Sequence, residues 1–232
     1  LARTRDRLRP WYDRLGLGAP PEVLPDLGPG FDAARLALLL EMRPAVASFH
    51  FGLPEPQAVR ALQAAGIAVI STATTVAEAR ALEAAGIDAV IAQGWEAGGH
   101  RGSHRPADPA QGVGTMALVP QIVDAVRLPV IAAGGIADGR GIAAAFALGA
   151  AGVQMGTAFL SCPEAGTDAR RRALLSRATE TDTMVTDAIS GRSARAVRST
   201  YAEAMAADPA PLPAFQQMYA LTDPMLDASR DD

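Results

Sequence analysis

The stretches AAGIAVIS (residues 64–71) and AAGIDAVIA (residues 84–92) repeat one local pattern twenty residues apart. Each starts at the end of a helical segment, turns at a glycine and continues into a short apolar run, which is typical of a buried parallel strand. A repeated unit of this kind favours a closed parallel barrel over an open sheet. The two stretches therefore predict an α/β fold, a TIM-like (β/α)8 barrel.

Further strands are expected on both sides of this repeat, separated by helical segments such as residues 55–65 and 76–85. Five strands cannot close an eight-stranded barrel, and open parallel edges invite unwanted pairing. We therefore expect a barrel that is incomplete at its N-terminus in this chain. Either the chain is part of a longer protein that contains the missing strands, which we favour, or a partner supplies them. The five predicted strands are residues 45–51, 67–71, 88–92, 130–133 and 152–155.

The pattern changes near residue 164, from alternating strands and helices to a charged helix, a Thr-rich segment and a Pro-rich linker. We expect residues 1–163 to form the barrel portion and residues 164–209 a small second domain that caps it. Residues 210–232 are expected to form a C-terminal helix that returns to the barrel.

The segment AQGWEAGGHRG (residues 92–102) directly follows a predicted strand and places His100 among four glycines. Glycines allow positive φ angles and let a planar ligand approach the backbone without interference from Cβ atoms. An imidazole exchanges protons near neutral pH, so His100 is a candidate general base. The same spacing also fits a tight loop with a solvated histidine.

Two glycine turns follow the last two predicted strands, at Gly134-Gly135 and at Gly156-Thr157. Backbone N–H groups from both loops and from a helix N-terminus are able to converge on one phosphate, which in barrels usually binds at the last two loops. Ordinary left-handed turns in a βα repeat would give the same pattern.

Other polar residues near these loops have more ordinary interpretations. Asp138 is expected to cap the helix at residues 139–148, and Glu96 to cap a helix or pair with Arg101. His104 is expected on a mobile rim loop. His50 lies at the carboxyl end of a strand, where it either contacts substrate or serves as a structural histidine.

The composition agrees with an ordinary α/β enzyme: 232 residues, 49% of them hydrophobic, with a formal net charge of -4. The acidic balance argues against a nucleic-acid surface. All 21 basic residues are arginine, which excludes a lysine Schiff base. The single cysteine, Cys162, fits a reducing compartment, and neither a membrane-spanning run nor a signal peptide is visible. We expect a cytoplasmic protein without a metal site.

Three motifs, in this order and spacing, resemble the nitronate monooxygenases, formerly called 2-nitropropane dioxygenases: AQGWEAGGHRG, AAGGIADGRG (residues 132–141) and GVQMGT (residues 152–157). The resemblance implies an FMN-binding TIM-like barrel with a small second domain over the flavin. The motifs are shared in part with the flavin-dependent enoyl-acyl-carrier-protein reductases. Three other segments are similar to the same family: SFHFGLP (residues 48–54), GTMALVPQIVDAV (residues 114–126) and TDAISGRSAR (residues 186–195).

The resemblance also implies the roles of individual residues. His100 would be the catalytic residue, while the possible substrate contact of His50 rests only on its position at the carboxyl end of a strand. The expected FMN contacts are Gln93 and Gly98 after one strand, Gly134 and Gly135 at the phosphate, and Gln154, Met155, Gly156 and Thr157 to complete the site.

The activity that the resemblance implies is FMN-dependent oxidation of alkyl nitronates, and of nitroalkanes where they are accepted, by dioxygen to a carbonyl compound and nitrite. An enoyl-thioester reductase that uses NAD(P)H stays open as the alternative. The third possibility is a barrel fragment that serves only as a binding or assembly module. The presence of His100 and of every motif glycine argues against it. The expected partners are a small nitronate and dioxygen, with no nucleic acid and no membrane. A homo-oligomer is compatible with these expectations.

Overall fold

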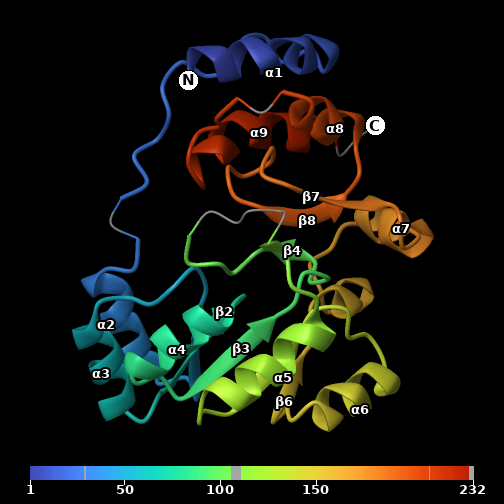
Figure 1. Ribbon diagram of the computed structural model, residues 1–232. Helices are drawn as coiled ribbons and strands as arrows, with labels where there is room; N and C mark the ends of the chain where they lie inside the picture. The colour runs from blue at the N-terminus through green and yellow to red at the C-terminus, as the bar shows by residue number, and fades with distance from the viewer. Residues whose placement is uncertain (29, 106–110, 209, 230–232) are drawn as a thin grey trace. The chain divides into compact units, whose positions relative to one another are not determined.

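The structure, a computed structural model, describes residues 1–28, 30–105, 111–208 and 210–229. It divides into two compact units (Figure 1). The sheet unit comprises residues 29–160, and the terminal unit combines residues 1–28 with residues 161–232. Each unit has a hydrophobic core of its own.

The sheet unit is built on five parallel strands in the order β1-β2-β3-β5-β6, and Figure 1 labels β2, β3 and β6 of them. Each strand overlaps one of the five predicted from the sequence, so the expected α/β fold with a parallel sheet is confirmed. The bounds are β1 (Val46–Phe49), β2 (Ala68–Ala73), β3 (Ala89–Gln93), β5 (Val130–Ala133) and β6 (Gly152–Gln154).

Helices follow the strands in βα order and cover the apolar residues of the sheet. The central strand β3 is buried along its whole length. Leu62, Ile67 and Ile122, each at most 1% exposed, belong to the core cluster formed by these strands and helices. The helices are α2 (Ala33–Met42), α3 (Pro56–Ala64), α4 (Val76–Ala84), α5 (Thr115–Ala125) and α6 (Gly139–Ala147), with a two-residue strand β4 (Gly99–His100) and a 3₁₀-helix η2 (Thr157–Ser161) in the loops.

The strands β1 and β6 form the two ends of this sheet within the part of the chain that the structure describes. On β1, Val46 is 47% exposed although its side chain is apolar and β-branched. The strand ends on the carboxyl side are aligned, because Gln93, Ala133 and Gln154 occupy successive positions in one register row. The loops after β3, β5 and β6 therefore leave the sheet at the same level.

The terminal unit joins the two ends of the described chain. Its core contains Leu8 and Tyr12 from the first helix together with Met218, Leu221 and other apolar side chains. The Tyr12 hydroxyl donates to the Leu221 carbonyl oxygen at 2.8 Å. The elements are α1 (Ala2–Arg14), α7 (Ala169–Arg177), the antiparallel pair β7 (Thr183–Thr186) and β8 (Ala194–Val197), α8 (Thr200–Ala206) and α9 (Gln217–Ala228).

This division differs from the expected segments 1–163, 164–209 and 210–232. The first 28 residues group with the C-terminal part of the chain instead of with the sheet. The reason is the apolar stripe of α1, where Leu8 and Tyr12 are spaced by four residues and face α9. Helix α9 likewise shares one core with Met205 of α8, so residues 161–232 do not separate into a cap and a lone helix.

Replacing Leu8 by Ala tests the placement of α1. Leu8 is fully buried, so we expect the substitution to lower the free energy of unfolding by about 2–5 kcal/mol. Leu38→Ala is the matched control, because Leu38 lies on α2 and is 53% exposed. Urea denaturation followed by circular dichroism measures both. Equal stability of the Leu8 variant and the wild type would show that α1 does not pack in this core.

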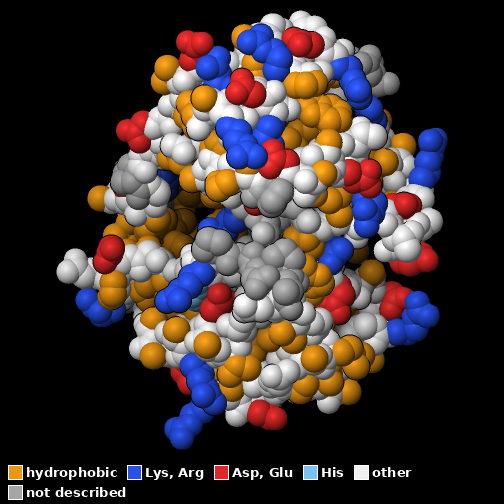
Figure 2. Space-filling view, turned by 45° about the horizontal axis from the view of Figure 1, so that its top comes forward, with side chains coloured by type: hydrophobic (Ala, Val, Ile, Leu, Met, Phe, Trp, Pro, Cys, Tyr) orange, Lys and Arg blue, Asp and Glu red, His pale blue; other side chains and the backbone are white. Residues whose placement is uncertain are grey.

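Charged side chains of both signs are interspersed over the face shown in Figure 2. Such mixing differs from the basic stripe that typifies a nucleic-acid-binding face. Among the described residues, no helix combines the length and apolar character needed to cross a membrane. In the same part of the chain, no group of three or more His, Cys, Asp or Glu residues is arranged to hold a metal ion.

Candidate active site

The loops after β3, β5 and β6 meet at positions where only glycine fits. A Cβ atom added to Gly98 would collide with Thr157 Oγ1. One added to Gly134 would lie 3.0 Å from the Ala97 backbone nitrogen, and one on Gly135 would lie 3.2 Å from Glu96 Cβ. These contacts bring the predicted residues of three loops together at the carboxyl end of the sheet.

Gly134 and Gly135 also need their glycine identity for conformational reasons, with φ angles of 107° and 69°. Gly156 differs, because nothing lies within 4 Å of a Cβ atom built on it. Gly156 and Thr157 are both exposed, so the backbone and hydroxyl of this turn are available to a ligand. We name Gly98, Gly134, Gly135, Gly156 and Thr157 the glycine cradle.

The N-terminus of α6, next to this cradle in sequence, is capped by the chain itself. The Asp138 carboxylate accepts from the backbone N–H groups of Arg140 at 2.9 Å and Gly141 at 3.3 Å, which confirms the expected cap. The side-chain hydrogen bond from Arg140, followed by the backbone N–H groups, lowers the pKa of Asp138. A phosphate in the cradle would therefore rely on the glycine loops rather than on these two helix N–H groups.

Glu96 caps a helix from a distance. Its carboxylate accepts a hydrogen bond from the backbone N–H of Thr115, the first residue of α5, at 2.8 Å. The N-cap residue of α5, Gly114, has no side chain that could accept this bond. The Thr115 hydroxyl lies 2.9 Å from the same carboxylate and 2.8 Å from the Gly134 carbonyl oxygen. Of the two interpretations offered by the sequence, the helix cap is correct, and it links the β3 loop to the β5 loop.

The segment around His100 is held by the buried side chain of Gln93. The Gln93 Nε2 donates to the His100 carbonyl oxygen at 3.0 Å, and its Oε1 accepts from the Gly102 backbone nitrogen at 2.8 Å. An amide has a second hydrogen and a second lone pair. The expected contact of Gln93 with a flavin would have to use those.

Arg101 fixes the same segment from the other side. It is 2% exposed, and its guanidinium donates to the carbonyl oxygens of Gly94 and, at 3.2 Å, of Gln93. Its guanidinium carbon lies 5.0 Å from the centre of the Trp95 ring. A buried arginine needs such partners, because an uncompensated charge is costly inside a protein. Sequence spacing did not reveal this role of Arg101.

All three histidines of the chain gather at the ends of β1, β2 and β3. His50 Nδ1 lies 2.9 Å from the Thr72 hydroxyl, and His50 Nε2 lies 3.3 Å from the His100 carbonyl oxygen. His104 Nε2 lies 3.0 Å from the Thr72 carbonyl oxygen. The sequence singled out the histidines but missed Thr72, whose only signal was a polar residue just beyond a predicted strand.

His104 is more firmly held than the sequence predicted. Besides its ring contact, its backbone nitrogen donates to Glu78 Oε1 at 2.8 Å, and Glu78 in turn accepts from the backbone of Thr74 at 2.7 Å. The expected mobile rim at this residue is therefore wrong. The rest of the predicted rim loop includes residues 106–110, which lie outside the described residues.

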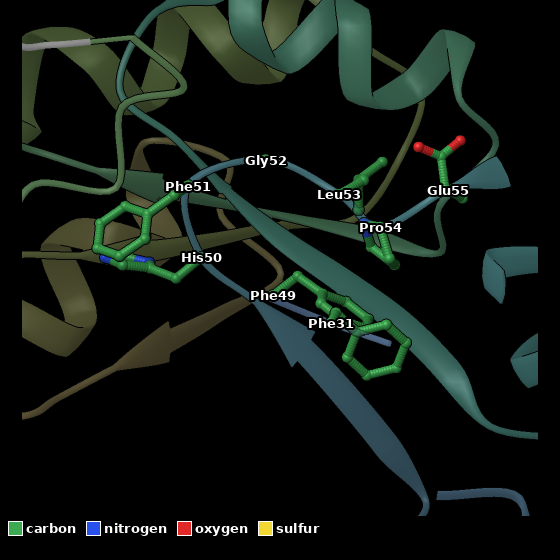
Figure 3. A pocket seen from close by; sticks show the side chains of 8 residues that line it. All are labelled: Phe31, Phe49, His50, Phe51, Gly52, Leu53, Pro54 and Glu55. Atoms are coloured by element: carbon green, nitrogen blue, oxygen red, sulfur yellow. The ribbon is translucent and has the colours of Figure 1, made fainter. Parts of the chain in front are cut away.

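A cavity of about 350 Å³ opens beside His50 (Figure 3). In Figure 3 the rings of His50 and Phe51 lie against each other. The rings of Phe31 and Phe49 pack edge to face, with their centroids 5.1 Å apart. The residues that line the cavity are mostly apolar in type, although more of the surface that faces it is polar than apolar. They are Phe31, Phe49, His50, Phe51, Gly52, Leu53, Pro54 and Glu55.

Comparison with known proteins identifies the family. The family described as nitronate monooxygenase matches residues 17–231, which is most of the chain. The chain belongs to the nitronate monooxygenase family. A nitronate monooxygenase of Pseudomonas aeruginosa is 48% identical over 220 residues, which cover 94% of this chain and 62% of that protein.

Solved structures agree with the family and with its TIM-barrel fold. A nitroalkane oxidase from Streptomyces ansochromogenes superposes with a TM-score of 0.88 at 39% identity, covering 98% of this chain and 65% of that one. FabK from Thermotoga maritima gives a TM-score of 0.66 at 37% identity, and the superposition covers 88% of this chain and 58% of that chain. The chain thus spans less than two thirds of the length of each of these three proteins.

Proposed function

We propose that this member of the nitronate monooxygenase family takes part in the FMN-dependent oxidation of alkyl nitronates by dioxygen, with a carbonyl compound and nitrite as products. The observation that supports it best is the meeting of the glycine cradle with the loop of His100. Gly98 and His100 are two residues apart on one loop, so a ligand in the cradle and a base would be positioned by the same element.

The residues present fit a flavin phosphate. Gly156 leaves open space beside its backbone, Thr157 is an exposed residue with a hydroxyl, and Gly134-Gly135 form a turn with positive φ angles after the neighbouring strand β5. Such a nest of N–H groups favours an anion. Gly134, Gly135, Gly156 and Thr157 would hold the phosphate, and Gln93, Gly98, Gln154 and Met155 would contact the rest of FMN.

A bound FMN would accept electrons from the substrate and pass them to dioxygen. The chain's own contribution is binding and proton handling. His100 would remove the α-proton of a neutral nitroalkane, or donate a hydrogen bond to the anionic nitronate when no proton has to be removed. Its ring contacts that of Phe51 edge to face, with centroids 5.9 Å apart, so it is oriented before substrate arrives.

His50 lines the cavity of Figure 3 and would contact substrate there. Both of its ring nitrogens have protein partners, at Thr72 and at the His100 carbonyl. Its contact with substrate would therefore be made by the ring carbons, as part of an aromatic wall with Phe49 and Phe51.

Anaerobic mixing tests the proposed function. The intact flavoprotein is mixed with propionate-3-nitronate and, separately, with NADH, and the flavin absorbance is followed. We expect the nitronate to bleach the flavin, and readmitted oxygen to restore the absorbance with release of nitrite. Bleaching by NADH alone would instead support the enoyl-thioester reductase, and bleaching by neither would contradict both activities.

A further inference from the structure

The carboxyl ends of three strands converge on one backbone group, the carbonyl of His100. Gln93, the last residue of β3, donates to this oxygen at 3.0 Å. His50, which follows β1, reaches the same oxygen through Nε2 at 3.3 Å. Thr72, in β2, contacts the other ring nitrogen of His50 at 2.9 Å. The position of the candidate base therefore depends on side chains from β1, β2 and β3.

The contacts determine the tautomer of His50. A carbonyl oxygen only accepts hydrogen bonds, so the Nε2 atom facing His100 must bear a hydrogen. In a neutral imidazole the other nitrogen, Nδ1, then has a lone pair, and the Thr72 hydroxyl is the donor to it. The hydroxyl of Thr72 thereby selects the form of His50 that is able to bind the His100 backbone.

Close packing limits alternatives to this arrangement. A Cβ atom on Gly102 would collide with Thr72 Cγ2 and would lie 2.6 Å from His50 Cε1, so the backbone of the His100 loop lies directly against both side chains. Phe51 has a φ angle of 71°, which is rare for a bulky residue, and its ring centre is 4.6 Å from that of His50. One side of the His50 ring thus lies against Thr72, Gly102 and Phe51, while the residue as a whole is exposed.

We propose that Thr72 and His50 are positioning residues for His100: the Thr72 hydroxyl fixes His50 as its Nε2–H tautomer, and His50 then holds the His100 backbone in place. The catalytic part of this proposal rests on the proposed function, in which His100 handles the substrate proton. The tautomer part stands on the hydrogen-bond geometry alone.

The test compares Thr72→Val, Thr72→Ser and wild type in the intact protein. Valine keeps the shape of threonine but removes the donor, whereas serine keeps the donor. Nitrogen-15 NMR of the histidine rings reports which nitrogen of His50 is protonated, independently of any activity. We expect Thr72→Val to reduce the population of the Nε2–H form and to shift the His100 signals, and Thr72→Ser to restore both.

Turnover gives the second measurement. A misplaced base reduces the rate of the chemical step, so we expect Thr72→Val to lower kcat for a nitroalkane by about 10- to 100-fold with little change in flavin content, and Thr72→Ser to recover most of it. Thr222→Val is the matched control, because Thr222 is equally buried at 2% and its hydroxyl bonds Ile189 in the terminal unit. This control should change neither the His50 spectrum nor kcat.

Two outcomes overturn the proposal. One is a His50 spectrum in Thr72→Val that matches the wild type, which removes the tautomer assignment. The other is a changed spectrum with wild-type kcat, which removes the positioning role. If the wild type itself does not oxidise nitronates or nitroalkanes, the proposed function fails, while the His50 and His100 signals still decide whether Thr72 positions this segment.

Discussion

His100→Asn is expected to lower the turnover of a neutral nitroalkane by about 10²–10⁴-fold, the usual contribution of a general base. The flavin should remain bound, since the substitution leaves the backbone carbonyl that Gln93 and His50 hold. The loss on a preformed nitronate should be smaller, because no proton has to leave carbon when the anion is supplied. Steady-state kcat and kcat/KM for both substrates measure the difference.

Other patterns of loss would assign His100 differently. Equal losses on nitroalkane and nitronate would indicate that His100 orients or stabilises the anion and is not the base. Wild-type rates on both would remove it from the mechanism and leave His50 and His104 as the remaining histidines. Flavin absorbance of each preparation serves as the control for an intact site.

Gly156→Val should strongly weaken FMN binding. We expect the dissociation constant to rise about 100-fold or more, which corresponds to a loss of about 3 kcal/mol of binding free energy. The protein itself has room for the valine, because nothing lies within 4 Å of the added Cβ atom and Gly156 does not have a positive φ angle. The clash would arise only with a ligand in the cradle. Fluorescence titration of the apoprotein with FMN measures the affinity, and thermal unfolding of the apoprotein checks the fold.

Gly166→Val is the matched control for this variant. Gly166 lies in the terminal unit, likewise has no atom within 4 Å of an added Cβ, and has no positive φ angle. It should bind FMN like the wild type. Unchanged affinity in Gly156→Val, or release of FAD instead of FMN from denatured wild type, would show that the phosphate does not bind at this turn.

The parallel sheet was predictable because its information is local. Each strand is a short apolar run between a helix and a glycine turn. Residues 84–92 repeat the pattern of residues 64–71, so the same helix–turn–strand unit occurs twice. The Asp138 cap was predictable for the same reason, since an N-cap bonds backbone only two or three residues away. The packing partner of α1 was not predictable from the sequence. The Tyr12–Leu221 hydrogen bond joins residues 209 positions apart, and an apolar stripe on a helix does not specify which element packs against it.

The candidate site shows the same limit. The glycines of the cradle and His100 are visible in sequence because residue type alone restricts what they do. The roles of Gln93 and Arg101 depend on which backbone group each side chain reaches after folding, and the role of Thr72 depends on its hydroxyl reaching the His50 ring. Residue spacing does not specify such long-range bonds of side chains. A glutamine at the end of a strand has the same sequence pattern whether it binds a ligand or a loop.

The loop after β3 has a consequence for how such a protein is able to diverge. Gly98 touches Thr157, and two residues later His100 is tied to Gln93, so both ends of this short segment are fixed to the scaffold. An insertion or deletion there would disturb the ligand cradle and the candidate base in a single step. Descendants with altered substrate range should therefore accumulate their changes on other elements, such as strand β1 and the residues that follow it, while this loop keeps its length.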